Sequence, residues 1–210
     1  MRLLPIADIN PGDAAIAESV QILRRGGVLA FPTETFYGLG ADATSESAVD
    51  RLFQVKGRDF SNPVAVIVAD ESAVTPLVEE IPAAARVLMQ AFWPGPLTLV
   101  FKASAAVLPR LTAGTGKIGI RVSSHPVARL LAAGLEGPLT ATSANLSGGP
   151  ECSSARDAAV TFGDALDAVV AGGKTEGGRG STILDVTVTP PVVLREGVIS
   201  QNRILAALGL

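Results

Sequence analysis

Residues 28–40 read VLAFPTETFYGLG, and this stretch sets the pattern for the rest of the chain. Val28–Phe31 is short and uniformly apolar, as expected of a strand that is buried on both faces, and Pro32 ends it. The small polar segment Thr33-Glu34-Thr35 follows at once. Because ligands bind at strand ends in open α/β sheets, this junction predicts the edge of a binding site.

The segments on both sides of this strand have helical spacing. Asp13–Arg25 and Ser45–Lys56 place apolar residues three or four positions apart, and glycine follows each of them. Further helices are predicted over Pro82–Phe92, Pro126–Ala133 (ended by Gly134) and Gln201–Leu208. Further strands are predicted near Val64–Ala69, Leu97–Lys102, Ile118–Val122, Leu139–Thr140, Ala168–Ala171, Thr182–Val186 and Val192–Arg195. Helices and strands alternate, but several strands follow one another closely. The expected fold class is α/β, with a twisted sheet of mixed parallel and antiparallel strands and flanking helices.

The composition sets limits on the class of protein. A length of 210 residues, of which 48% are hydrophobic, predicts a single domain over residues 1–210. No apolar run reaches the roughly 18 residues of a membrane span, and no secretory signal is apparent, so no membrane association is expected. The single cysteine, Cys152, cannot form an internal disulfide, which favours a cytoplasmic location. The net charge of -3 argues against a broad basic surface for nucleic acid, although not against a local basic pocket.

Cations and small polar residues gather at the ends of the predicted strands. The segment Ser143-Ala144-Asn145 follows one strand, and a glycine-rich stretch over 172–180, which is interpreted as a binding loop, precedes Ser181. Arginine forks match phosphate and carboxylate oxygens, and glycine lets backbone N–H groups approach phosphates. Together the residues predict an anion-binding pocket, whereas each one alone is equally consistent with a surface charge or a turn. The six cations in this pattern are Lys56, Arg58, Lys117, Arg121, Arg179 and Arg195.

Motifs of other site classes fail on their context. Gly114–Gly119 fits the dinucleotide pattern but leads into a predicted strand, so it is interpreted as a turn. Gly173-Lys174-Thr175 resembles the end of a phosphate loop, yet Ala168 stands where that loop needs its first glycine. His125 is the only histidine and is interpreted as a capping or surface residue, which leaves no base for a Ser-His-Asp triad. With one histidine and one cysteine, no His/Cys metal cluster is predicted.

The order of the longer motifs resembles the YrdC-like family. Pro32-Thr33-Glu34-Thr35-Phe36-Tyr37-Gly38-Leu39 is similar to the strand-turn that is the hallmark of that family. The resemblance covers roughly Ala14 to Gly197, and it implies a twisted α/β sheet around a deep, positively charged cavity. The other matching motifs, in chain order, are Lys56-Gly57-Arg58, Asn62-Pro63, Trp93-Pro94-Gly95-Pro96-Leu97-Thr98, Thr142-Ser143-Ala144-Asn145 followed by Ser147-Gly148, Gly180-Ser181-Thr182-Ile183, and Arg195 with Gly197.

The resemblance also implies an activity. The synthases of this family condense L-threonine, bicarbonate and ATP to L-threonylcarbamoyl-AMP and pyrophosphate. A partner complex then transfers the threonylcarbamoyl group to adenosine-37 of tRNA. The same nucleotidyltransferase reaction is therefore expected here, with ATP as a substrate and Mg²⁺ bridging its phosphates.

Site residues carry over motif by motif. The resemblance implies that Arg121 holds the threonine carboxylate, together with Thr35 and Ser181 on the same substrate. For Glu34, a structural role as a hydrogen-bond acceptor is an equal alternative to a substrate contact. The residues implied at ATP are Lys56, Arg58, Asn62, Ser143, Asn145 and Arg195, with Lys56 and Arg58 as the catalytic pair. The residues expected in the cavity without an assigned role are Thr33, Glu34, Thr142 and Ile67.

Two positions depart from the pattern of the family. Ile67 stands where many members carry a substrate-facing histidine. Arg121-Val122-Ser123 stands where Arg-Val-Pro is usual, so Ser123 replaces the proline. Because the chain stops at Leu210, a short form without the C-terminal domain of longer members is expected. Ile67 motivates one alternative function, a family paralogue that uses another acyl or carbamoyl substrate. The second alternative is an RNA-binding module of the same fold, which the acidic balance and an aromatic content of 4% disfavour.

Overall fold

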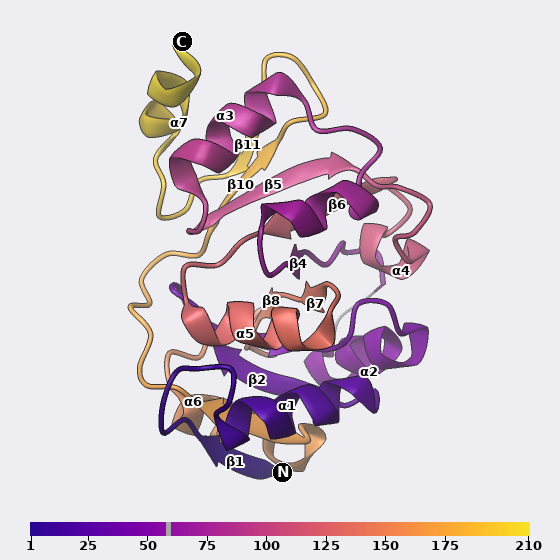
Figure 1. Ribbon diagram of the computed structural model, residues 1–210, viewed down its shortest axis with the longest axis vertical. Helices are drawn as coiled ribbons and strands as arrows, with labels where there is room; N and C mark the ends of the chain where they lie inside the picture. Colours follow the sequence, from indigo (N-terminus) through magenta and orange to yellow (C-terminus); the bar gives the residue numbers. More distant parts are fainter. Residues whose placement is uncertain (58–59) are drawn as a thin grey trace.

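The computed structural model describes residues 1–57 and 60–210, and over these residues the strands form two sheets (Figure 1). Each sheet contains both parallel and antiparallel neighbours, which confirms the predicted mixed pairing. The first sheet has the order β1 (Arg2–Pro5), β9 (Ala168–Ala171), β2 (Leu29–Pro32), β3 (Tyr37–Gly40), β8 (Thr142–Ser143). The second has the order β11 (Val192–Arg195), β10 (Thr182–Asp185), β5 (Leu97–Lys102), β6 (Lys117–Arg121), β4 (Val66–Ile67), β7 (Leu139–Thr140).

Helices cover both sheets, and none over 1–57 and 60–210 is long and apolar enough to cross a membrane. In Figure 1, α3 lies against the second sheet with α7 beside it, while α1 and α5 lie together on the first. The helices are α1 (Ala14–Arg24), α2 (Glu46–Lys56), α3 (Ala83–Phe92), α4 (Pro109–Thr112), α5 (Pro126–Leu135), α6 (Ala155–Phe162) and α7 (Gln201–Leu208), with 3₁₀ turns η1 (Glu71–Leu77) and η2 (Gly163–Ala165).

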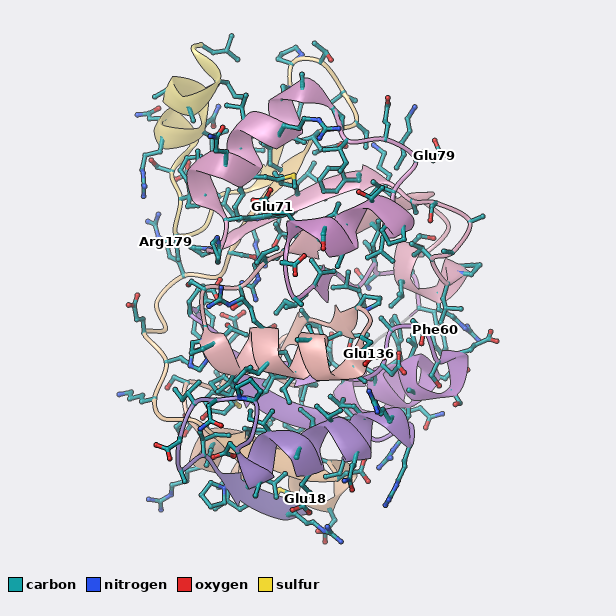
Figure 2. All side chains as sticks on the ribbon, viewed as in Figure 1. Glu18, Phe60, Glu71, Glu79, Glu136 and Arg179 are labelled. Carbon is teal, nitrogen blue, oxygen red and sulfur yellow. The ribbon has the colours of Figure 1, made fainter. Side chains whose placement is uncertain are left out.

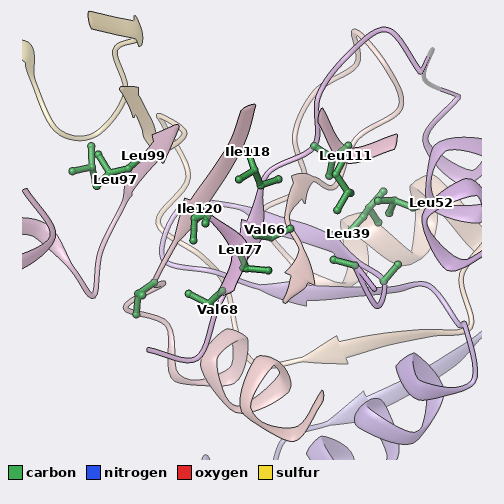
Figure 3. Packing of buried hydrophobic residues seen from close by; sticks show 14 of the residues in the cluster. Leu39, Leu52, Val66, Val68, Leu77, Leu97, Leu99, Leu111, Ile118 and Ile120 are labelled. Atoms are coloured by element: carbon green, nitrogen blue, oxygen red, sulfur yellow. The ribbon is translucent and has the colours of Figure 1, made fainter. Parts of the chain in front are cut away.

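Strand β2 is buried on both faces, as its apolar sequence predicts. Leu29 and Phe31 point to one face, where they share an apolar cluster with Leu23 of α1. Ala30 points to the other face, into the cluster that holds Phe162 of α6. Because side chains alternate along a strand, α1 and α6 cover opposite faces of the first sheet. The same alternation in β6 places Ile118 and Ile120 in the larger cluster (Figure 3).

Capping residues explain the predicted boundaries of α2, whereas the predicted end of α5 is wrong. Ser45 caps α2 by accepting from the N–H of Ala48, and Gly57 ends that helix in the left-handed region at φ +60°. By contrast, Gly134 does not end α5, which continues to Leu135. A Cβ at position 134 would lie 2.5 Å from Cγ2 of Val20 in α1. Close packing between α1 and α5 requires this glycine, so the predicted stop at Gly134 is wrong.

One predicted strand is shorter than expected, and β3 was not predicted at all. The apolar run Val64–Ala69 forms ladder pairs only at Val66–Ile67, because Ala65 turns its carbonyl to the N–H of Ala141 instead. Strand β3 was not expected, since two of its four residues are glycine. Its Gly40 lies under the ring of Phe31, where an added Cβ would meet Cε1 at 2.9 Å. Glycine is therefore needed for the aromatic ring to lie across the strand.

The two sheets meet where the chain leaves one for the other. Only Ala141 separates β7 of the second sheet from β8 of the first. Its N–H donates to Ala65 at 2.8 Å, and the N–H of Thr140 donates to Ala41 at 3.0 Å. The strands thus form two sheets, where a single sheet was predicted, and the residues that line one cavity come from both of them.

Candidate active site

The cavity between the sheets has a volume of about 190 Å³. This is below the 300–1,000 Å³ typical of drug-sized ligands, so the enclosed part suits a small molecule or one end of a larger one. A second hollow of about 360 Å³ lies beside η1, but its polar residues Asp70, Glu71 and Ser72 are exposed. The predicted site residues that line the first cavity are Thr33, Thr35, Arg121, Thr142, Ser143, Ser181 and Arg195.

Arg121 is the cation buried deepest in the lining. Its side chain is only 9% exposed and donates no hydrogen bond to any residue in 1–57 and 60–210. Glu34 faces it, with Oε1 at 3.3 Å from Nη1. Burial lowers the pKa of Arg121, the Glu34 carboxylate opposes that change, and the nearby charge of Arg195 adds to it. A buried guanidinium whose donors make no hydrogen bond within the described residues can receive an anion in the cavity.

The second cation of the lining, Arg195, is held by the backbone. Its Nε and Nη2 donate to the carbonyl of Ser181 at 3.3 and 2.8 Å, and Nη2 also lies 3.3 Å from the Ser181 hydroxyl. That hydroxyl is 2.9 Å from the hydroxyl of Thr98, and both residues are buried. Arg195, Ser181 and Thr98 therefore form one ordered polar edge along the second sheet.

The turn after β2 forms the opposite wall. The Thr33 hydroxyl donates to the carbonyl of Phe36 at 2.6 Å and lies 3.1 Å from the Thr35 hydroxyl. Because the Thr33 proton goes to the Phe36 carbonyl, the Thr35 hydroxyl is the donor in its contact with Thr33. Thr35 therefore offers acceptor lone pairs to the cavity. The glycine-rich loop before Ser181 closes over this turn, because Gly177 donates to the Thr35 carbonyl at 2.8 Å.

Lys56 at the end of α2 anchors the segment that follows β8. Its Nζ donates to the carbonyls of Ser143 (2.5 Å) and Asn145 (3.3 Å) and to Asn145 Oδ1 (2.9 Å). The Lys56 side chain is buried, and neither Lys56 nor Asn145 lines the enclosed cavity. This network lies directly behind Ser143, which does line it.

Several predicted site residues lie elsewhere. Ile67 does not reach the cavity, because the two-residue period of β4 sends its completely buried side chain into the cluster with Phe31 while Val66 lines the site. The expectation that Ile67 faces the cavity is therefore wrong. Asn62 is exposed beside Ser61 and outside the lining, and Arg58 lies outside the described residues.

Two cations of the predicted pocket also lie outside it. Lys117 sits at the opposite end of β6 from Arg121 and pairs with Asp185 at 2.8 Å. Arg179 is 70% exposed at the edge of the molecule, 3.9 Å from Glu196 (Figure 2). The sequence shows that a cation lies at the end of a strand but not which end of the strand faces the cavity. The predicted set of pocket cations was therefore too large.

Neither Thr98 nor the role of Ser123 was predicted from the sequence. Thr98 is a polar residue within an apolar strand, which is a usable signal for an inward-facing hydroxyl. Ser123 is completely buried, and its hydroxyl donates to Oε2 of Glu34. His125 was expected to be a cap or a surface residue, but it makes no side-chain cap, and its Nδ1 is buried without a hydrogen-bond partner among the described residues. Burial lowers the pKa of His125, and Glu34 opposes that change.

Among the described residues, the titratable side chains form neither a cluster of metal ligands nor a reactive thiol. In the part of the chain that the structure describes, no three His, Cys, Asp or Glu side chains form a group that could hold a metal ion. Cys152 is buried, and burial raises the pKa of its thiol, so it remains protonated near neutral pH.

Comparison with known proteins places these observations in a family context. The family model for Sua5, YciO and YrdC, described as telomere recombination, matches residues 21–197. The chain is 41% identical over 187 residues to threonylcarbamoyl-AMP synthase of Pyrococcus abyssi, which covers 89% of this chain and 55% of the relative. The chain is 40% identical over 203 residues to the enzyme of the same name from Bacillus subtilis, and this match covers 96% of this chain and 59% of that relative. The chain thus spans little more than half the length of these two relatives. It covers 94% of a putative threonylcarbamoyl-AMP synthase of Mycobacterium tuberculosis, at 38% identity over 204 residues and 97% of this chain.

Solved structures agree with the fold. The structure of P. abyssi Sua5 complexed with L-threonine superposes with a TM-score of 0.95 at 38% identity, covering 100% of this chain and 61% of that one. Escherichia coli YciO superposes with a TM-score of 0.86 at 26% identity, covering 97% and 98%.

Proposed function

We propose, because this chain belongs to the Sua5/YciO/YrdC family, that it is an L-threonylcarbamoyl-AMP synthase. In this reaction the amine of L-threonine combines with bicarbonate to give a carbamate and water. A carbamate oxygen then bonds to the α-phosphorus of ATP, the bond from that phosphorus to the β-phosphate oxygen breaks, and pyrophosphate leaves. The enzyme class is accordingly nucleotidyltransferase.

The observation that carries the proposal is the buried guanidinium of Arg121 in the cavity, which faces Glu34 but donates no hydrogen bond within residues 1–57 and 60–210. An amino acid offers a carboxylate of the right charge and geometry for a bidentate contact with that group. The hydroxyls of Thr35 and Ser181 line the same cavity and can bind the polar side chain or the amine. A volume of about 190 Å³ suits a ligand of this size better than a whole nucleotide.

A related structure supports the same assignment. The P. abyssi protein described as complexed with L-threonine shares 38% identity with this chain over its full length. Relatives of nearly equal length exist, since the Mycobacterium tuberculosis protein is covered to 94%.

ATP would extend from the enclosed cavity over the Lys56 network. Arg195 and Ser143 line the cavity wall, and Lys56 and Asn145 order the segment that carries Ser143. Arg58 and Asn62 complete the motif set at ATP by resemblance. Phosphoryl chemistry of this kind depends on positioning and charge neutralisation more than on a protein base, so the lack of a catalytic histidine is no obstacle. Mg²⁺ would be held mainly by the phosphates, with few protein ligands.

The product is expected to pass to a complex that modifies adenosine-37 of tRNA, in the cytoplasm. Of the alternatives, a paralogue with another substrate rested on Ile67, and the burial of Ile67 outside the cavity removes that reason. An RNA-binding module would show strongly salt-dependent RNA binding without nucleotide turnover.

The decisive experiment is pyrophosphate release from ATP and bicarbonate, with L-threonine, with L-serine, or without an amino acid. We expect release that requires L-threonine, and loss of that release in Arg58→Ala. Release that prefers another amino acid would replace the proposal with the paralogue. A folded protein that releases no pyrophosphate under any of these conditions would overturn it.

A further inference from the structure

We propose that Ser123 is a positioning residue that restrains Glu34, so that the guanidinium of Arg121 stays available to the carboxylate of the substrate. This inference rests on the proposed function, because it assumes that an amino acid is the anion that Arg121 binds. Arg121 and Ser123, at the end of β6, are buried, and Glu34, in the turn after β2, is largely buried with a side chain 13% exposed.

The hydroxyl of Ser123 has a fixed orientation. It donates its only proton to Oε2 of Glu34 and accepts from the backbone N–H of His125 at 3.2 Å. Ser123 is completely buried, so water does not compete for either bond. One oxygen of Glu34 is therefore held away from Arg121 by a charge-assisted hydrogen bond.

The other oxygen of Glu34 makes only a loose contact. Oε1 lies 3.3 Å from Nη1 of Arg121, within ion-pair range, yet it is buried and has no hydrogen-bond partner in the described part of the chain. Arg121 in turn donates no hydrogen bond to any of those residues. Glu34 thus balances the charge of Arg121 without occupying its donors.

This arrangement depends on the serine hydroxyl. Carboxylates and guanidinium groups prefer a bidentate pair with two parallel hydrogen bonds. A Glu34 side chain without the bond from Ser123 is free to turn both oxygens to Arg121. The substrate carboxylate would then have to displace an internal competitor that is already in place.

The test compares Ser123→Ala with Ser123→Ala/Glu34→Gln and with Ser124→Ala, which removes a hydroxyl from the exposed neighbour. Pyrophosphate release gives KM for L-threonine and for ATP, and thermal unfolding reports stability. We expect Ser123→Ala to raise the KM for L-threonine about tenfold or more, the equivalent of one charge-assisted bond, and to change the KM for ATP less than twofold. The added Glu34→Gln change should return the KM for L-threonine toward the wild-type value, because a neutral amide competes poorly with a carboxylate. Ser124→Ala should behave as wild type.

Three outcomes would overturn the inference: an unchanged KM for L-threonine in Ser123→Ala, equal effects on both substrates, or a double variant as impaired as the single one. A purely structural role for Ser123 would lower the unfolding temperature without selective loss of threonine affinity. The wild-type protein decides the proposed function separately. If it releases no pyrophosphate, calorimetric titration with L-threonine replaces the kinetic readout, and absence of L-threonine binding would overturn the inference as well.

Discussion

Asn145 Oδ1 lies 2.9 Å from Lys56 Nζ, and the same oxygen accepts from the Ser143 hydroxyl at 2.6 Å. The amide nitrogen of Asn145 donates to the carbonyls of Leu146 and Gly149 at 2.9 and 3.0 Å. One side chain therefore ties the end of α2 to both ends of the 143–149 segment. Because its hydrogen bonds are already made within the protein, Asn145 shapes the site by ordering Ser143.

Replacing this side chain should damage stability and nucleotide binding together. Asn145→Ala removes a charge-assisted bond and three neutral ones, so we expect a loss of about 2–4 kcal/mol in the free energy of unfolding. The KM for ATP should rise, because Ser143 loses its fixed position. Urea denaturation and steady-state kinetics measure the two effects. Leu146→Ala, at an exposed neighbour, serves as the control, and equal behaviour of the two variants would contradict the assigned role.

Thr182 makes a second, fully buried hub at the base of Arg195. Its hydroxyl donates to the Ile199 carbonyl at 2.6 Å and accepts from the N–H groups of Gly197 and Ile199 at 2.9 and 3.1 Å. Thr182→Val keeps the shape but leaves buried groups unpaired, so we expect the unfolding free energy to fall by about 2–4 kcal/mol. Thr182→Ser keeps the hydroxyl and should lose about 1 kcal/mol, mainly from the missing methyl group. Urea midpoints compare the stability of the two variants. If the serine variant is destabilised as much as the valine variant, packing of the methyl group and not hydrogen bonding stabilises this turn.

Asp13 gives the stability of the protein a dependence on pH. Its carboxylate accepts four backbone N–H groups, from Ala15 and Ile16 on Oδ1 and from Ala7 and Asp8 on Oδ2. The bond from the Asp8 N–H, with the other three, holds the pKa of Asp13 below its ordinary value of 3.8, although burial alone would raise it. A lowered pKa in the folded state stabilises the protein above the unfolded pKa, and the benefit disappears as pH falls through the folded value.

Asp13→Asn should therefore destabilise the protein near neutral pH. Its effect should shrink as the pH falls below the ordinary value of 3.8 and through the lower folded-state pKa of Asp13, where the wild-type carboxyl also becomes neutral. Urea midpoints at pH 7, 5 and 3 test this, with the exposed Asp8→Asn as the control. Parallel pH profiles for wild type and Asp13→Asn would contradict the assignment.

Periodicity and capping predicted most elements, and the exceptions have physical reasons. Strand β3 was missed because its glycines serve the ring of Phe31 and look like a turn in the sequence. Helix α6 was also missed, although Ser154 with Asp157 three residues later is a recognisable N-terminal cap, and the Ser154 hydroxyl does accept from the Asp157 N–H at 3.1 Å. Strand β1 is an exposed edge of four residues with little pattern to detect.

The candidate site was predictable as residue types but not as geometry. Arg121 and Ser181 stand far apart in the sequence, and strand pairing brings both to one cavity, as expected from motifs at strand ends. Neighbouring side chains of β4 point to opposite faces, so Val66 lines the cavity and Ile67 does not. Motif spacing alone does not show which of the two faces the cavity. The bond from Ser123 to Glu34 joins two loops and has no local signal in the sequence.

Arg121→Lys tests whether the fork of the guanidinium, and not merely its charge, binds the substrate. Lysine keeps the positive charge opposite Glu34 but cannot present two parallel donors to a carboxylate. Loss of one charge-assisted bond of about 1.5–3 kcal/mol corresponds to a rise of about 10- to 150-fold in the KM for L-threonine. The KM for ATP should change much less, because Arg195 and the Lys56 network remain intact. Arg129→Lys is the matched control, since that arginine lies on α5 beside the second hollow. Equal KM values for L-threonine in the two variants would show that Arg121 acts only as a charge, and the bidentate contact would have to be abandoned.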